Sequence, residues 1–388
     1  MRCHHARMSI VALSAALLAL PCLCRAQVRG LDIPESRLRG RLSDDDRDRI
    51  REAIGNLVGD MADAETAEEV YEARNALTNL RNDLDLYREP SRLFASTAAE
   101  ELLKLIQNPR EKLTRLKEVN ACMAITSLRR PAAATAYRAM LSHASGAVRH
   151  FGWDGCRWVA IDVVAGDGDA GPGFLSKIGE AAKAESSPIV AEQMFRMLAA
   201  PNTPMADIPE EDRLAARREL LGAMDPAWRK WCRRVLRGSV EAARSCETAL
   251  PGLRASYARF EGDEATRSNI LQMLADLLWA SSEAYRAAGA EGAVAEANAR
   301  VLEAVEARLN ELIGSDRTSV SNPLDSGTMD PDAKAKAVRR AALEWIELHL
   351  SGMDVKNPRD RLVEPTPTPS TGPAEEGDGP ESGDESDE

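Results

Sequence analysis

Apolar residues recur every three or four positions along most of the chain, the spacing that places side chains on one face of an α-helix. Ile50, Ile54, Leu57 and Val58 form one such stripe behind the acidic helix start at residues 43–46. Prolines and polar turns separate the stripes. Helices are therefore predicted over residues 66–84, 91–108, 110–129, 131–142, 145–165, 174–184, 189–199, 209–224, 226–250, 263–288, 291–313 and 331–350.

Residues 131–199 contain two copies of a helix, turn, helix unit. Val148 and Val190 hold equivalent places in the two copies, 42 residues apart. A unit of this kind at this period is typical of stacked helical repeats. Gly152 and Gly155 lie inside the second helix of the first copy, although glycine lowers helix propensity.

The residues at these turns resemble those of HEAT repeats. The resemblance rests on the helix opening at Pro131, the turn from Ser145 to Arg149, the following Trp158 to Ala160 and a weaker echo from Ser187 to Val190. It covers about residues 110–200. HEAT-type repeats form curved stacks that serve as scaffolds or binding surfaces, so the resemblance implies that architecture and that role.

The first 26 residues have the three-part layout of a secretory signal. A short basic stretch precedes an apolar run from Ser9 to Leu20, and the small residues Cys24 and Ala26 follow. Larger residues precede the two cysteines at this end of the segment, where lipidation usually requires a small residue. We therefore expect cleavage near Ala26 without lipidation, and an exported chain in the periplasm or outside the cell.

Residues 357–388 are predicted to be a disordered tail, Pro- and Thr-rich and then acidic. Glu364 to Glu388 holds nine Asp or Glu and no Lys or Arg, which accounts for much of the net charge of −12. The rest of the chain has no basic run, so we expect no nucleic-acid partner. No window of 18 apolar residues occurs, so no transmembrane segment is expected in the mature chain.

Between these ends the pattern divides the chain into three parts. They are N-terminal helices over residues 27–109, HEAT-like repeats over 110–204 and a C-terminal helical region over 205–356. In the last part, residues 263–288 and 291–313 are predicted to form an antiparallel hairpin. Only 4% of residues are aromatic, which favours helices over a sandwich or barrel. The fold expected is all-α, a HEAT-like α-solenoid continuing into a helical bundle or hairpin.

His143 and His150 are weak candidates for a metal site. Asp154 and Cys156 follow closely, and a turn could gather imidazole, carboxylate and thiolate around zinc. The close ligand spacings of zinc motifs are absent, however. We therefore expect neither a metal nor another cofactor, and we read His143 as a turn residue.

Other catalytic and ion-binding patterns are weaker still. Asp167 to Gly171 begins like a calcium loop, but Ile178 occupies the twelfth position, where a glutamate is expected. No nucleophile motif or phosphate loop occurs at a strand-to-helix junction. Glu303 and Glu306 lie opposite the apolar stripe of their helix and are predicted to be solvated.

Four cysteines remain after cleavage, and Cys232 and Cys246 are the first candidate disulfide pair. If residues 226–250 form one helix, the two are about 21 Å apart along its axis and cannot bond. If the chain turns at Arg237 and Gly238, they face each other in a hairpin and can. Cys122 and Cys156 make a weaker pair.

The tryptophans occur in two close pairs, Trp153 with Trp158 and Trp228 with Trp231. Clustered tryptophan can mark a binding hot spot. The other interpretation, which the sequence favours, is that they fill gaps between alanine-rich helices.

Taken together, these patterns favour an exported, non-enzymatic helical scaffold of the cell envelope that binds another protein. The tail would be a solubilising or docking segment. One alternative is a metal-dependent or carboxylate enzyme in a helical bundle, although the Glu-x-x-His pairs of that class are absent. A carrier that encloses an apolar ligand is the other.

Overall fold

The computed structural model describes residues 31–108, 112–166, 170–199 and 208–363, and every regular element in them is helical. The predicted signal segment, the Asp167–Asp169 loop and the acidic tail from Glu364 lie outside the described residues. The α-helices are α2 (Glu35–Leu38), α3 (Asp44–Asp63), α4 (Ala67–Leu84), α5 (Arg88–Gln107), α6 (Thr114–Leu128), α7 (Ala134–Met140), α8 (Gly146–Gly166), α9 (Ala170–Ala184), α10 (Pro188–Arg196), α11 (Glu210–Leu236), α12 (Val240–Glu247), α13 (Leu250–Arg259), α14 (Glu264–Ala287), α15 (Gly292–Ile313), α16 (Ser321–Asp325), α17 (Pro331–Glu344) and α18 (Pro358–Leu362). Shorter helical turns are η2 (Pro131–Ala133), η3 (Met197–Ala199), η4 (Trp345–His349) and η5 (Ser351–Met353).

The helix starts follow local side-chain chemistry. Ser43 with Asp46 and Thr66 with Glu69 form capping boxes at α3 and α4, in which each side chain bonds the other residue's backbone N–H. The predicted break before Pro226 was wrong, because α11 continues through this proline. A proline inside a helix costs one backbone hydrogen bond. Burial of Ala227 and Trp228, directly after the proline, favours the unbroken helix over a break.

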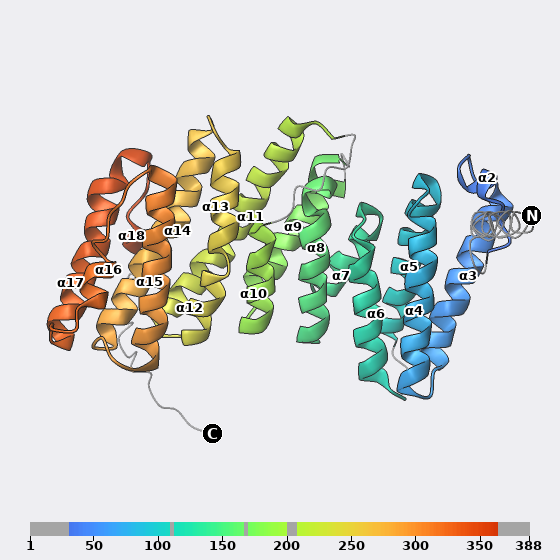
Figure 1. Cartoon of the computed structure of the whole chain (residues 1–388), viewed down its shortest axis with the longest axis horizontal. Coiled ribbons are helices and arrows are strands. Elements are labelled where there is room, and N and C mark those ends of the chain that lie inside the picture. Colours follow the sequence, from blue (N-terminus) through green and yellow to red (C-terminus); the bar gives the residue numbers. More distant parts are fainter. Residues whose placement is uncertain (1–30, 109–111, 167–169, 200–207, 364–388) are drawn as a thin grey trace, which may run out of the picture.

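The helices stack in two layers, in which each helix contacts the next helix of its own layer (Figure 1). One layer follows α3, α5, α7, α9, α11, α14 and α17, and the other follows α4, α6, α8, α10, α12 and α15. Contacts between the layers join helices close in sequence, such as α7 with α8 and α14 with α15. The last pair is the predicted antiparallel hairpin. The described parts of the chain therefore form an elongated stack that is compatible with a helical repeat fold.

Basic side chains link neighbouring units at a recurring sequence separation. Arg81 Nη1 donates to Ser127 O at 2.7 Å, 46 residues away, and Arg234 Nη1 donates to Ser186 O at 3.0 Å, 48 residues away. Lys230 Nζ donates to Lys183 O at 2.8 Å, a separation of 47. Each acceptor lies at or just beyond a helix C-terminus, where backbone carbonyls lack intrahelical partners. These contacts run in both directions along the stack, because Arg81 reaches a carbonyl of a later unit and Lys230 and Arg234 reach carbonyls of an earlier one.

The glycines of α8 allow α7 to approach it closely. A Cβ atom on Gly155 would lie 2.2 Å from Tyr137 Cδ1, and one on Gly152 would lie 2.9 Å from Met140 Cβ. Tyr137 is fully buried and its hydroxyl donates to Ile125 O at 3.0 Å. Glycine here therefore costs helix propensity but permits a helix contact that no larger residue allows.

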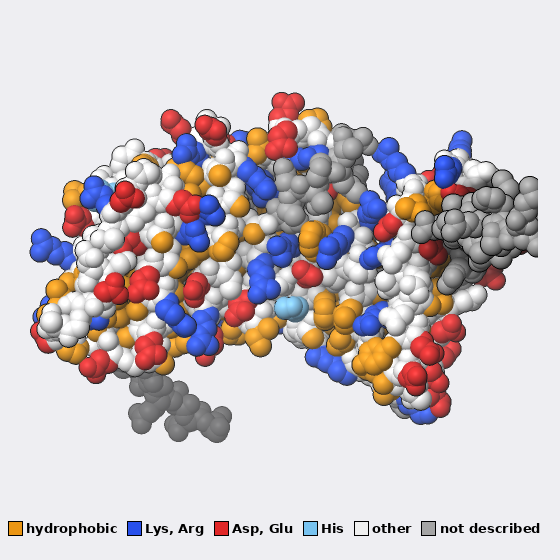
Figure 2. All heavy atoms as spheres, in the orientation of Figure 1, with side chains coloured by type: hydrophobic (Ala, Val, Ile, Leu, Met, Phe, Trp, Pro, Cys, Tyr) orange, Lys and Arg blue, Asp and Glu red, His pale blue; other side chains and the backbone are white. Residues whose placement is uncertain are grey.

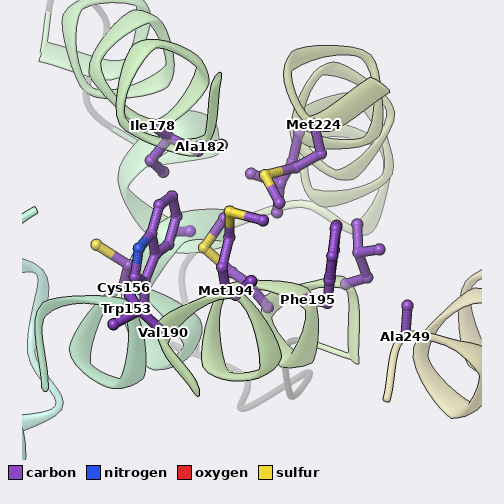
Figure 3. Packing of buried hydrophobic residues seen from close by; sticks show 14 of the residues in the cluster. Trp153, Cys156, Ile178, Ala182, Val190, Met194, Phe195, Met224 and Ala249 are labelled. Atoms are coloured by element: carbon purple, nitrogen blue, oxygen red, sulfur yellow. The ribbon is translucent and has the colours of Figure 1, made fainter. Parts of the chain in front are cut away.

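One continuous apolar core runs between the layers. Figure 3 shows its middle, where Trp153 of α8 lies near Ile178 of α9, Val190 and Met194 of α10, and the Met224 side chain of α11 comes from the opposite side. Val190 and its equivalent Val148 are both buried. The two copies of the predicted unit thus present matching positions to the same core.

The C-terminal part differs from its prediction in two places. The interval 314–330, where no helix was predicted, contains α16, whose Leu324 packs in the core. The predicted disordered tail begins too early at residue 357, because Pro358 and Leu362 are buried when α18 packs on α11 and α14. A short apolar pair within a charged stretch is too weak a signal to predict a docked helix.

Candidate functional site

The candidate metal residues do not converge. His143 Nδ1 accepts a hydrogen bond from Ser145 N at 3.1 Å, which makes it a turn residue, and it lies 3.9 Å from Glu118. Cys156 is fully buried beside Trp153 (Figure 3), and burial raises the pKa of its thiol. His150 instead packs edge-on against the Phe151 ring. Among the residues that the structure describes, no group of three or more His, Cys, Asp or Glu could hold a metal.

Cys232 and Cys246 are brought together by the helical hairpin. α11 ends at Leu236, Gly238 takes a φ of 85°, and α12 returns from Val240. Of the two alternatives, the single helix over residues 226–250 is therefore wrong, and the chain turns at Arg237 and Gly238. Both thiols are fully buried and hydrogen-bond each other, and burial is the main cause that raises the pKa of Cys232 well above its usual value. They are free thiols in this structure.

A buried carboxylate lies next to this thiol pair. Asp276 of α14 is fully buried, and desolvation raises its pKa from 3.8 to about 7. Gln272 Nε2 donates to Asp276 Oδ1 at 2.9 Å, and Arg361 Nη2 lies 3.4 Å from Oδ2. Both Asp276 and Arg361 act electrostatically on the Cys232 thiol.

Arg361 comes from the C-terminal segment, residues 351–363, which closes over this cluster. Its guanidinium also pairs with Asp225 of α11 at 2.6 Å. Gln272 binds the backbone of Lys356 through both its amide atoms, donating at 3.0 Å and accepting at 2.6 Å. Arg233 Nε donates to Leu362 O at 3.0 Å. Side chains of α11 and α14 therefore hold the segment in place, although both helices are distant from it in sequence.

Sequence reasoning missed this cluster, although one signal was present. Asp276 is an acid inside the strongly apolar stretch from Leu271 to Ala280. A lone charge in such a stretch is buried and needs a partner. The partner Arg361 lies 85 residues later in a segment predicted to be disordered, so no local pattern could name it.

Three of the four candidate tryptophans belong to the core. Trp153, Trp228 and Trp231 are fully buried, and Trp228 Nε1 donates to Met273 O at 3.0 Å. Burial excludes these three from direct contact with a partner. The interpretation as an interaction cluster is wrong for them, because their rings fill the space between the layers, where Phe195 packs edge-on against Trp228 and Trp231.

Trp158 of α8 is different, because part of its indole reaches the surface. The Arg129 guanidinium lies 3.9 Å from the ring centroid and that of Arg157 lies 5.7 Å away. Neither guanidinium forms an ion pair with a carboxylate of the described residues. Asp154, one turn before Trp158 on α8, instead accepts a hydrogen bond from Gln193 Nε2 at 2.8 Å. Two cations at one indole form a site suited to a carboxylate or other anion.

A second surface cluster lies on the adjacent helices of the same layer. Tyr71 of α4 is 44% exposed and Met123 of α6 is 40% exposed. Arg74 joins them, with its guanidinium 5.5 Å from the Tyr71 centroid and Nη1 3.6 Å from Met123 Sδ. Figure 2 shows hydrophobic side chains gathered over α6 and α8, while charged side chains of both signs are scattered over the rest of that face.

These helices run in the same direction, so the clusters belong to one face. Arg74 Nη1 donates to Asn120 Oδ1 at 2.9 Å, Arg81 reaches Ser127, and Thr126 Oγ1 donates to Phe151 O at 3.2 Å. We call the exposed surface of α4, α6 and α8 the α4–α8 face. Across the described chain, none of the helices combines the length and apolarity that crossing a bilayer requires.

Comparison with known proteins assigns no relative. No family model matches the sequence, and no curated protein matches it. Among solved structures, the chain is similar to the crystal structure of an engineered protein at 12% identity, covering 79% of this chain and 93% of the other with a TM-score of 0.21. A similarity of this size assigns neither a fold nor a function, so the family of this chain is not established.

Proposed function

We propose that this protein is an exported, non-enzymatic scaffold of the cell envelope, a HEAT-like α-solenoid that binds another protein through its α4–α8 face. The two-layer stack supports the architecture, because stacking similar helix pairs leaves one long surface of parallel helices on each side. Fold alone does not give function, so the proposal rests on side chains of that surface.

The observation that carries it is the Arg129–Trp158–Arg157 site. A half-buried indole flanked by two guanidinium groups is a fixed feature, because Trp158 is held by α8 and its ring is covered by Arg129. Arginine, tryptophan, tyrosine and methionine are the residues enriched at protein interfaces, and all four types occur on this face. An acidic segment of a partner protein fits the charge of the site.

A capture experiment with matched variants tests the proposal. The chain from Gln27, a double variant Arg129→Glu with Arg157→Glu, and a control Arg359→Glu would be incubated with native envelope extract. We expect a stoichiometric protein partner with the unmodified chain and the control, and at least about a tenfold loss in the double variant, as for truncation of a hot spot. Thermal melting of each variant checks that the fold is kept.

A version of the chain that ends at Val363 shows whether the partner binds the α4–α8 face or the acidic tail. A partner retained by this version and lost by the double variant supports binding at the α4–α8 face. A partner that is lost only with residues 364–388 contradicts it and makes the acidic segment the docking element. Capture of nothing by any version also contradicts the proposal.

No observation favours the two other functions. An enzyme would require converging carboxylates or a nucleophile beside a base, and the buried carboxylates Asp276 and Glu306 are each bound to partners inside the core. A carrier would require an apolar chamber. The described cavity lined mainly by apolar side chains, near Leu77 and Phe94, has a volume of about 10 Å³, barely the size of one water molecule.

A further inference from the structure

The helical hairpin of α11 and α12 brings the thiols of Cys232 and Cys246 together. Gly238 N donates to Val235 O at 2.8 Å and Ser239 N to Arg234 O at 3.0 Å, which closes α11 with a tight left-handed turn. Cys232 lies before this turn and Cys246 after it, and their thiols are in hydrogen-bonding contact. Side chains on facing arms of so short a hairpin are within reach of a covalent bridge.

The two other described thiols have different surroundings. Cys122 of α6 is buried, and burial together with Glu118 raises its pKa to about 12. Cys156 of α8 is buried, and burial alone raises its pKa. Among the described residues, no other thiol affects the pKa of Cys122 or of Cys156. The pKa of Cys232, in contrast, depends on Cys246. The alternative pairing of Cys122 with Cys156 therefore has no contact to support it.

The folded protein encloses the Cys232–Cys246 pair. Both residues are fully buried, Asp276 of α14 lies on one side, and the C-terminal segment 351–363 brings Arg361 to Asp276 and Asp225. Thiol–disulfide exchange needs a thiolate that an external disulfide can reach. Both thiols are enclosed, and burial disfavours the thiolate of Cys232 by raising its pKa, so the bond must form before the segment and α14 close over the hairpin.

We propose that Cys232 and Cys246 form a disulfide, by exchange with a disulfide reagent or disulfide-donating protein, at a folding stage before the C-terminal segment docks. One thiolate attacks the external disulfide and displaces one half of the donor as a thiolate. The second protein thiolate then attacks the mixed disulfide and displaces the other half as a thiolate. Two protein thiols are thereby oxidised to one disulfide, and the two protons they lose pass to the two donor thiolates, so the donor is reduced to two thiols. This inference is independent of the scaffold function, because it concerns the hairpin and not the α4–α8 face.

Refolding with trapping of free thiols tests the pairing. The chain from Gln27 keeps every described residue and leaves four cysteines. It would be refolded from the reduced, denatured state with reduced and oxidised glutathione, then denatured with iodoacetamide and digested for mass spectrometry. We expect Cys232 and Cys246 in one linked peptide pair, and Cys122 and Cys156 alkylated. Alkylation of all four cysteines, or linkage of any other pair, overturns the proposal.

Oxidation of the folded, reduced protein tests the order of events. We expect oxidised glutathione to leave the Cys232–Cys246 pair of the native protein reduced, and the variant Arg361→Ala to form the bond at least about tenfold faster, since local opening governs access to buried groups. Arg359→Ala on the same helix is the matched control, because the Arg359 side chain is exposed, and should oxidise like the unmodified protein. Equal, fast oxidation of all three proteins overturns the proposed order.

Discussion

Glu306 is a buried carboxylate surrounded by donors. It accepts hydrogen bonds from Val320 N at 2.7 Å, Ser321 N at 2.8 Å and Trp345 Nε1 at 2.9 Å, and from the hydroxyls of Ser319 and Ser321. The prediction that it is solvated was wrong, whereas its neighbour Glu303 is exposed as predicted. The residues that bind Glu306 come from the α15–α16 loop and from η4, and helix periodicity contains no information about them.

Replacing Glu306 by glutamine should destabilise the protein, because an amide offers one acceptor oxygen and turns two N–H donors toward other donors. We expect a loss of about 3 kcal/mol in the free energy of unfolding, the usual cost of unsatisfied buried groups bonded to a charge. Glu303→Gln is the matched control and should change it by less than about 0.5 kcal/mol. Urea denaturation measures both, and equal effects would show that the buried network contributes nothing.

Asp276 should make stability depend on pH. Its pKa is about 7 in the folded protein against 3.8 ordinarily, because burial disfavours the charged form. The native state therefore holds the proton longer than the unfolded state, and this group contributes full stability below the unfolded pKa and loses it as pH rises through the folded value. Asp225 raises this pKa further, and Arg361, Arg229 and Gln272 oppose the rise.

Asp276→Asn removes the titrating group and should flatten this dependence. Between about pH 5 and about pH 8 the unmodified protein should lose on the order of 2 to 3 kcal/mol through Asp276, and the variant should lack that loss. Denaturant unfolding at both pH values measures the difference. Parallel pH profiles for the two proteins would mean that Asp276 is ionised in the folded state at both pH values.

At the scale of single helices, prediction succeeded where a local signal decided the structure. The helix starts behind the acidic residues 43–46 and at residue 66 were read from a few neighbouring residues. It failed at Pro226, where packing of Trp228 outweighs the local preference of proline, and at α18, whose partners lie more than 80 residues away. Local preference is a weak guide where tertiary burial opposes it.

The contact between α7 and α8 should fail if Gly155 acquires a side chain. A Cβ atom there would overlap the Tyr137 ring, so Gly155→Ala should destabilise by about 1 to 3 kcal/mol despite the better helix propensity of alanine. Gly55→Ala in α3 meets nothing within 4 Å and should stabilise by about 0.5 to 1 kcal/mol. Thermal or urea unfolding measures both changes. If both substitutions stabilise the protein, α7 can move away from Gly155 without loss of stability.

For the whole molecule, the stacking of helix pairs explains which features were predictable. Most contacts join elements close in sequence, so a reading of successive amphipathic helices was sufficient for the all-α fold and for the pairing of α14 with α15. The candidate sites were harder, because Arg129 meets Trp158 and Asp276 meets Arg361 only after stacking. The order of helices along the stack, and hence the α4–α8 face, required the structure.

The docked C-terminal segment makes the two ends of the stack mechanically unequal. Arg361 joins Asp225 across 136 residues, so α18 acts as a clasp around the last helices, while the N-terminal helices have only near neighbours. If the molecule is pulled from both ends in an optical trap, the N-terminal pairs should peel away first, one at a time. The clasped portion should then open in one larger step, and Arg361→Ala should divide that step into smaller ones. The C-terminal end of the molecule would then resist force as one rigid unit, whereas the N-terminal end would extend gradually under the same force.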